Sequence, residues 1–218
     1  MNTTASIAGI LQLSPVMPVV TIEEAATAVD LARALVRGGI RVIEVTLRTS
    51  QALRAIEAIA AQVPEICVGA GTVMTPEDLN LVANAGAAFA ISPGATRELL
   101  AAGTNFRIPY LPGVATGSEL MSALTAGYSH FKLFPANVAG GLGALKAFQG
   151  PFPDARFCPT GGVTPQTAGS YLELPNVLCV GGSWLTPADA TQARDWGRIE
   201  ALAREAAALR PTRVTARS

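Results

Sequence analysis

The stretch EEAATAVDLARALVRGGIRVIEVT, residues 23–46, decides the fold class. Its first part carries apolar residues at helical spacing and ends in two glycines, which predicts a helix and its stop. Its last part, Arg41 to Thr46, is apolar and β-branched, which predicts a buried strand. The same unit recurs along the whole chain, so the sequence indicates a parallel sheet covered by helices.

Eight such units are expected, with strands recurring about every twenty to twenty-five residues. The predicted strands are Val16 to Val20, Arg41 to Thr46, Ile66 to Gly69, Phe89 to Ile91, Arg107 to Leu111, His130 to Phe134, Arg156 to Pro159, and Val177 to Val180. Eight units without a linker predict a single-domain (β/α)8 TIM barrel over residues 1–218. A short helix is expected within residues 1–14 and a loose tail over 207–218. The alternative is an open doubly wound sheet, whose G-x-G-x-x-G fingerprint is missing after the first strand.

Composition narrows the class of partner. Sixteen basic and sixteen acidic residues cancel, which argues against nucleic acid and acidic membranes as partners. The N-terminus lacks the basic start of a signal peptide, and no apolar run reaches the length of a membrane span. The three cysteines lie in apolar stretches and are odd in number, so we expect buried free thiols in a cytoplasmic protein. The cysteine spacing and the single histidine fit no zinc site, and no metal is expected.

Because successive side chains of a strand point to opposite faces, the apolar neighbours of two charged residues predict which way those charged side chains point. In HFKLFP, residues 130–135, the two bulky apolar residues are expected to face the helices, so Lys132 between them points into the barrel. In RVIEVTLR, residues 41–48, the apolar residues alternate in the same way, and Glu44 points inward beside Thr46. Because interior layers are built from alternate strands, the two charged side chains can meet in one layer.

An inward lysine and glutamate are costly in an apolar interior unless they are paired or functional. One interpretation is a structural salt bridge. Their place towards the carboxyl ends of the strands, where this fold carries its chemistry, favours catalysis. A lysine forms a Schiff base only as the neutral amine, which a dry pocket and a cation such as Arg48 favour and Glu44 opposes. Glu44 is then the expected proton shuttle.

Glycine pairs follow the last two predicted strands. CPTGGVTP, residues 158–165, and CVGGSWLTP, residues 179–187, are each expected to turn at the glycines and open a capped helix. Such loops often bind phosphate in barrels, through backbone N–H groups and helix N-termini. The alternative is that the glycines only make tight turns. The predicted phosphate cradle consists of Gly161, Gly162, Gly181, Gly182 and Ser183.

At this point the sequence resembles the 2-keto-3-deoxy-6-phosphogluconate (KDPG) aldolase family, whose members often also cleave 4-hydroxy-2-oxoglutarate. GIRVIEVTLR, from Gly39 to Arg48, and GYSHFKLFPANVAG, from Gly127 to Gly140, match the two signature stretches of the family. VGAGTV, ISPG, RFCPTGGV and CVGGSWL follow in the family's order. The resemblance extends from Pro15 to about Ala206.

The resemblance implies a role for each matching residue. Lys132 would form the imine, and Glu44 would be the general acid and base. The implied substrate contacts are Arg48 and Thr72 for the carboxylate of the pyruvate half, Gly161, Gly162 and Ser183 for the phosphate, Pro93 and Phe134 for the pocket wall, and Thr160 for the middle of the substrate.

The implied protein is a homotrimeric class I aldolase of the Entner–Doudoroff pathway with no metal or organic cofactor. It would cleave 2-dehydro-3-deoxy-6-phosphogluconate to pyruvate and D-glyceraldehyde 3-phosphate, and 4-hydroxy-2-oxoglutarate to pyruvate and glyoxylate. Its only expected partners besides its own copies are small molecules, the phosphorylated keto acid and pyruvate. One alternative is the aldolase for the galactonate epimer, although Thr160 favours the gluconate enzyme. Others are an isomerase or decarboxylase on a phosphate-binding barrel, and a non-catalytic barrel that senses a sugar phosphate.

Overall fold

The structure is a computed structural model that describes residues 6–209. The predicted helix within residues 1–14 is present as α1, Ile7–Leu11, and the predicted tail overlaps the last helix, which ends at Ala207. Residues 1–5 and 210–218, where the rest of both predictions falls, lie outside the described residues. The strands are β1 Val16–Val20, β2 Val42–Thr46, β3 Cys67–Gly71, β4 Ala90–Ile91, β5 Tyr110–Leu111, β6 Gly113–Val114, β7 His130–Leu133, β8 Arg156–Pro159 and β9 Val180–Gly182.

Helices alternate with these strands, as the repeated unit predicts. They are the 3-10 helix η1 Ala25–Thr27, then α2 Ala28–Arg37, α3 Ala52–Gln62, α4 Pro76–Asn84, α5 Arg97–Gly103, α6 Gly117–Thr125, α7 Gly141–Phe148, α8 Pro165–Leu172, α9 Ala188–Gln192 and α10 Trp196–Ala207. The opening repeat behaves as expected, because α2 stops before two glycines and Gly39 takes a φ of 94°. Thr75 and Asp78 form a capping box on α4, with Pro76 in its first turn, so local residues define the start of this helix.

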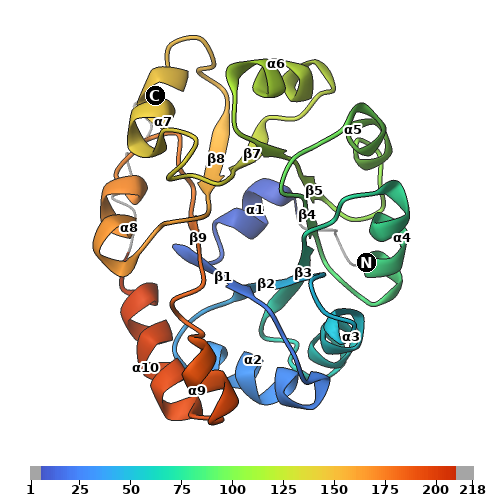
Figure 1. Cartoon of the computed structure of the whole chain (residues 1–218), viewed down its shortest axis with the longest axis vertical. Coiled ribbons are helices and arrows are strands. Elements are labelled where there is room, and N and C mark those ends of the chain that lie inside the picture. The colour runs from blue at the N-terminus through green and yellow to red at the C-terminus, as the bar shows by residue number, and fades with distance from the viewer. Residues whose placement is uncertain (1–5, 210–218) are drawn as a thin grey trace.

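Every strand pair is parallel, and the sheet curls. One run of paired strands has the order β5-β4-β3-β2-β1-β9, and the other has the order β6-β7-β8. Two isolated bridges, Phe157 with Val177 and Thr160 with Gly181, join the β8 side to the β9 side. Figure 1 shows the strands around a common centre, with the helices outside and α1 across the middle of the view. The architecture is therefore α/β and barrel-like, as predicted.

Two of the predicted strands were wrong in detail. The stretch from Arg107 to Leu111 was predicted as a strand, but only its last two residues form β5, and a further short strand, β6, follows Pro112 and was not predicted. Proline has no N–H to donate, so β5 bonds to β4 and β6 bonds to β7, while the Pro112 carbonyl accepts from Lys132 N at 2.9 Å. The last strand begins at Val180 instead of Val177, and Val177 makes only an isolated bridge.

The core has two layers that follow strand parity. The larger apolar cluster holds the outward residues of the strands together with the helices, including Ile43, Val45, Phe131 and Leu133. A smaller cluster fills the interior of the curled sheet, and its members are Ile10, Leu11, Met17, Val42, Phe89, Ile91, Leu111, Cys158 and Cys179. The predicted facing of both motif strands is therefore confirmed.

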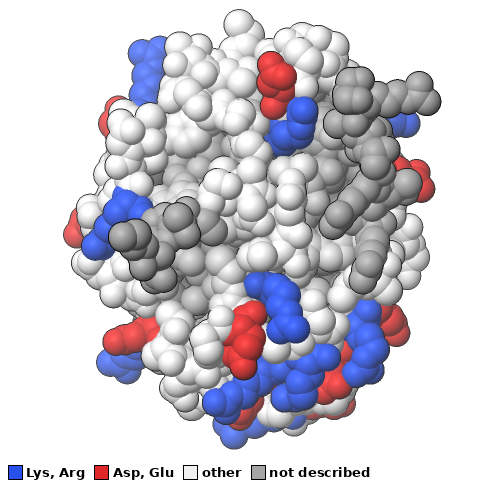
Figure 2. All heavy atoms as spheres, turned by 180° about the vertical axis from the view of Figure 1, so that it is seen from behind, with Lys and Arg blue, Asp and Glu red and all other residues white. Residues whose placement is uncertain are grey.

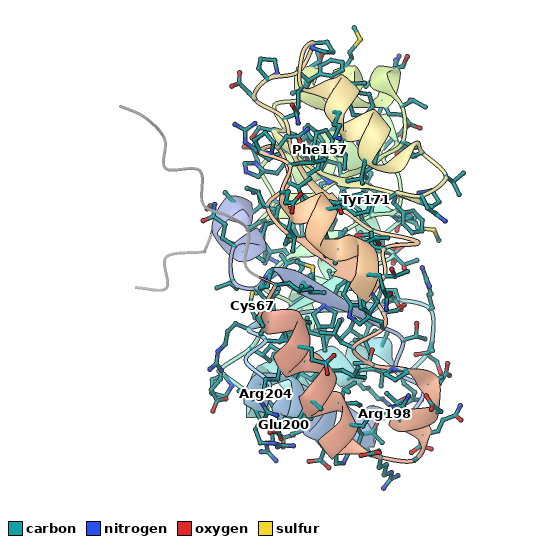
Figure 3. The ribbon with its side chains drawn as sticks, turned by 90° about the vertical axis from the view of Figure 1, so that its left-hand side faces the viewer. Cys67, Phe157, Tyr171, Arg198, Glu200 and Arg204 are labelled. Carbon is teal, nitrogen blue, oxygen red and sulfur yellow. The ribbon has the colours of Figure 1, made fainter. Side chains whose placement is uncertain are left out.

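Helix α1 closes the interior at the amino ends of the strands. It contributes Ile10 and Leu11 to the inner cluster, and Ser14 just beyond it accepts a hydrogen bond from Arg41 N, before β2, at 2.9 Å. Figure 3 shows α1 at one end of the sheet, near Cys67, the first residue of β3. The opposite end, where the strands finish, is left for the site.

Charged side chains gather at the end of the molecule that holds α2 and α10, at the bottom of Figure 2. There Glu200 pairs with Arg37 at 2.8 Å and with Arg204 at 2.6 Å. Within residues 6–209, no helix combines the length and the apolar character that crossing a bilayer requires.

Candidate active site

Lys132 and Glu44 meet in the interior of the sheet. Lys132 lies on β7 and Glu44 on β2, and their residues are 4% and 1% exposed. Lys132 Nζ donates to Glu44 Oε1 at 2.9 Å and to Oε2 at 3.3 Å. Outward packing of their apolar neighbours turns both side chains inward, as parity predicted. A buried amine therefore shares a hydrogen bond with a buried carboxylate.

Two further side chains surround this pair. The ring of Phe134 lies 5.2 Å from Lys132 Nζ, so its π face stabilises a positive charge on that nitrogen. Thr46, on the Glu44 side of β2, donates to the Val20 carbonyl at 3.1 Å, and its hydroxyl lies 3.0 Å from that of Thr21. Among the described residues, no buried side-chain nitrogen or oxygen lacks a hydrogen-bond partner. The pair is therefore buried among side chains whose polar atoms are hydrogen-bonded.

The pair can carry out both halves of imine chemistry. When Lys132 gives up a proton to Glu44, the amine gains the lone pair that attacks a ketone. The protonated carboxyl then lies within reach of the oxygen that must leave as water. Because the two groups are already in hydrogen-bond contact, this proton moves without diffusion of an outside base.

Three of the predicted substrate contacts follow successive strands. Arg48 lies two residues beyond β2 and is exposed, Thr72 follows β3, and Pro93 lies two residues beyond β4. Thr72 has a φ of 61°, one of two positive values among the described non-glycine residues. A threonine in this region costs roughly 1–3 kcal/mol, and such strain collects at functional sites. The three residues therefore follow the carboxyl ends of neighbouring strands, and their contact with a substrate stays a prediction.

The first glycine pair forms the predicted turn. After β8, Gly161 and Gly162 have φ values of 97° and 76°, which side-chain-bearing residues rarely adopt. Helix α8 then begins at Pro165, and Thr164 N donates to Thr167 Oγ1 at 3.0 Å. Exposed backbone and a helix N-terminus are therefore presented together, which suits an anion.

The second glycine pair does not form a turn, and that part of the prediction is wrong. Gly181 and Gly182 lie within β9, and no helix opens directly behind them. Ser183 starts a hydrogen-bonded turn to Thr186 N, and α9 begins only at Ala188 without a side-chain cap. Both glycines are explained by packing, because a Cβ at Gly181 would overlap Thr160 Oγ1 and a Cβ at Gly182 would overlap the Trp184 ring.

A pocket of about 490 Å³ adjoins Ser183. Its walls come from the carboxyl end of β1 and the segment that follows, and from α9, with Thr21, Glu23 and Arg194 among its lining residues. No sequence motif predicted this pocket, because its walls lie far apart along the chain, as the Glu24–Arg194 contact shows with a separation of 170 residues.

The other ionisable groups near the interior are not poised as nucleophiles. Burial raises the pKa of the Cys67 thiol to about 11. The hydrogen bond to the Cys158 thiol, together with burial, raises the pKa of Cys179 well above its ordinary value. Both cysteines are therefore protonated at neutral pH, as expected for core thiols. No group of three or more histidine, cysteine or acidic side chains in residues 6–209 is arranged to hold a metal ion.

Comparison with known proteins agrees with this geometry. Residues 7–202 match the family model described as KDPG and KHG aldolase. The KHG/KDPG aldolase of Escherichia coli strain K12 is 54% identical over 205 residues, which cover 94% of this chain and 96% of that protein. The 2-dehydro-3-deoxy-phosphogluconate aldolase of Pseudoalteromonas atlantica is 53% identical, with 95% and 96% covered.

A solved structure extends the likeness to three dimensions. The KDPG aldolase of Legionella pneumophila, crystallised with pyruvate captured at low pH as a covalent carbinolamine intermediate, is 50% identical. It aligns with a TM-score of 0.91 over 93% of this chain and 98% of its own. With buried amine, paired carboxylate, fold and sequence all in agreement, this chain belongs to the KDPG and KHG aldolase family.

Proposed function

We propose that this chain is a Schiff-base aldolase that cleaves 2-dehydro-3-deoxy-6-phosphogluconate to pyruvate and D-glyceraldehyde 3-phosphate. The observation that carries the proposal is the buried contact of 2.9 Å between Lys132 Nζ and Glu44 Oε1 in the interior of a barrel-like sheet. A sensor that only bound a sugar phosphate would have no use for a buried amine next to a proton acceptor. An isomerase or decarboxylase would need no imine.

Lys132 acts as the nucleophile. Its neutral amine attacks the C2 ketone to give a carbinolamine, and Glu44 returns a proton to the departing hydroxyl so that water leaves. The resulting protonated imine is an electron sink, and the nearby Phe134 ring stabilises its positive charge. This step converts an unreactive ketone into a group that can accept the electrons of the C3–C4 bond.

Glu44 then acts as the base for cleavage. The carboxylate removes the proton of the C4 hydroxyl, directly or through one water, and the C3–C4 bond breaks. D-Glyceraldehyde 3-phosphate departs and leaves an enamine on Lys132. Protonation of the enamine and hydrolysis of the imine release pyruvate and restore the amine. Each proton taken is later returned, so a single carboxylate serves the whole cycle.

The rest of the substrate is held by residues around the carboxyl-end mouth. Arg48 supplies a guanidinium for the carboxylate next to the ketone, and the Thr72 hydroxyl assists it. The turn at Gly161 and Gly162 offers backbone N–H groups to the phosphate, with Ser183 opposite. The remaining contacts of the proposed pocket are Pro93, Phe134, Thr160, Gly181 and Gly182.

A second substrate, 4-hydroxy-2-oxoglutarate, is supported by the name of the Escherichia coli relative, KHG/KDPG aldolase. Its C1 carboxylate, C2 ketone and C4 hydroxyl present the same reacting atoms to Lys132 and Glu44. It carries a carboxylate in place of the phosphate tail, so it would use the imine chemistry without the glycine cradle. The products are pyruvate and glyoxylate.

The proposal extends to the architecture. We propose that the sheet closes into a single-domain (β/α)8 barrel. This is supported by the short step from β5 to β6 and by the isolated bridges of Phe157 with Val177 and Thr160 with Gly181. The family likeness also supports a cytoplasmic homotrimer. Exposed apolar side chains at Met121 and Val138 supply surface for contact between copies. Light scattering of the purified protein tests the trimer, and a monomer at micromolar concentration would rule it out.

Trapping tests the central claim. The protein is incubated with pyruvate, reduced with borohydride and mapped by mass spectrometry, and the expected adduct lies on Lys132. An unmodified protein, or an adduct on the exposed helical Lys146 instead, would overturn the proposal.

Glu44→Gln should keep pyruvate binding and lose turnover by about 10²–10⁴-fold, the usual contribution of a general acid or base. Comparison of the gluconate and galactonate epimers then assigns the substrate.

A further inference from the structure

The inward face of β3 carries no side chain beside the catalytic pair. In the register of β2 with β3, Glu44 lies opposite Gly69 and Thr46 lies opposite Gly71. Each glycine leaves room that a neighbour fills. A Cβ on Gly69 would overlap the ring of Phe89, and a Cβ on Gly71 would overlap Glu44 Oε1 and lie 2.7 Å from its Cδ and Cγ.

The backbone does not require glycine at position 71. Its φ is not among the positive values that side-chain-bearing residues avoid, so an alanine could adopt the same strand conformation. Glycine inside a strand is less stable than alanine by roughly 0.5–1 kcal/mol. What position 71 requires is space, and the space is occupied by the carboxylate of Glu44.

We propose that Gly71 is a positioning residue that directs the Glu44 carboxylate onto Lys132. Without a side chain on Gly71, the end of the Glu44 side chain lies against β3, from where both oxygens reach Lys132 Nζ at 2.9 and 3.3 Å. A methyl group there would overlap the end of the Glu44 side chain, so this flexible side chain has to move aside and its oxygens leave their positions at Lys132 Nζ. This inference rests on the role proposed above for Glu44.

Gly71→Ala is the first variant to test. It should lower kcat by about a hundredfold or more, the range expected for a misplaced general base, and change KM for the keto acid less than threefold. The limb of the kcat–pH profile that Glu44→Gln removes should also vanish. A large rise in KM with little change in kcat would instead mean that the alanine disturbs Thr72, the next residue, and would overturn the proposal.

Gly69→Ala is the matched control. It adds the same methyl to the same face of the same strand, but the methyl meets the Phe89 ring in the apolar layer. It should lower stability and leave the shape of the kcat–pH profile unchanged. If both alanine variants alter the profile alike, Gly71 acts through the fold and the proposal fails.

A double variant separates positioning from general damage. If Gly71 acts through Glu44, then adding Gly71→Ala to Glu44→Gln should change kcat by less than about threefold, because coupled residues are not additive. An equal loss in both backgrounds would overturn the proposal. Should Gly71→Ala fail to fold, Glu44→Ala with Gly71→Ala should be as stable as Glu44→Ala alone, since the overlap is gone; a double variant less stable than Glu44→Ala also refutes it. Borohydride trapping of pyruvate on the wild type tests the proposed function by itself, so a failure of the Gly71 proposal can be told apart from a failure of the proposed function.

Discussion

Removing both charges of the catalytic pair should leave the protein inactive and at least as stable as the wild type. Three variants are needed: Lys132→Met, Glu44→Met, and the double variant. Methionine keeps the unbranched shape of both side chains, so it follows their paths with little repacking. The single variants each leave one buried charge without its partner, whereas the double variant leaves none.

The magnitudes follow from the geometry of the pair. Both side chains are buried, and among residues 6–209 they hydrogen-bond only to each other, through Nζ and the two carboxylate oxygens. Breaking such a pair from one side costs about 3–5 kcal/mol, while replacing both partners by apolar side chains is neutral or stabilising by roughly 1–4 kcal/mol. In a chain of this size 1 kcal/mol corresponds to about 2–4 °C, so each single variant should melt roughly 6–20 °C lower.

Urea unfolding followed by tryptophan fluorescence and circular dichroism measures these differences, at one fixed protomer concentration because assembly shifts apparent stability. The double-mutant cycle should give a coupling of at least about 3 kcal/mol. Single variants as stable as the wild type would refute the reasoning, since the pair would then not be an isolated buried ion pair. A double variant less stable than either single variant would refute it as well.

Three other predictions concern groups around the site. Ser183→Ala should raise KM for the phosphorylated substrate by about ten- to a hundredfold, the loss of one hydrogen bond to a charged group, and leave KM for 4-hydroxy-2-oxoglutarate unchanged in steady-state kinetics. Burial and, as the smaller effect, the positive charge of Arg156 lower the pKa of His130. His130 is the single histidine of the sequence, so its imidazole resonance can be followed by NMR, and it should titrate with a pKa below about 6.5. As the pH falls, the unfolded chain binds this proton before the folded chain does, so the free energy of unfolding decreases below about pH 6.5. Between pH 7.5 and 5.5, His130→Gln should therefore lose less stability than the wild type. Cys67, with its pKa at about 11, should react with iodoacetamide at pH 8 about a hundredfold more slowly than a thiol with a pKa of 9.

Much of the fold could be predicted because alternation and spacing encode it locally. The outward packing of Phe131 and Leu133 makes Lys132 an interior residue whatever the rest of the chain does. The same alternation on β2 predicted that Glu44 also points into the interior. Because interior layers are built from alternate strands, the contact between Glu44 and Lys132 could be predicted as well. A residue's facing is therefore readable from its nearest neighbours.

The misses arose where long-range contacts decide the local structure. The strand β6 was missed because it pairs with β7, whereas β5 before Pro112 pairs with β4, and this change of partner is visible only in the folded chain. Gly181 and Gly182 looked like a turn, yet they extend β9 because Thr160 and Trp184 need the room that a Cβ would take. Gly71 was hidden for the same reason: its use is visible only once the Glu44 side chain is in place.

Helix α1 closes the interior of the curled sheet at the amino ends of the strands, and this has a stereochemical consequence. Below the catalytic pair the interior is filled by apolar side chains such as Ile10, Leu11 and Val42, so hydrogen ions reach the enamine only from the mouth where the strands finish. An enamine that is approached from one side receives its new hydrogen on one face. Turnover of 2-oxobutanoate in heavy water should accordingly place deuterium at C3 in a single configuration. The handedness of that product would be set by the helix that seals the opposite end.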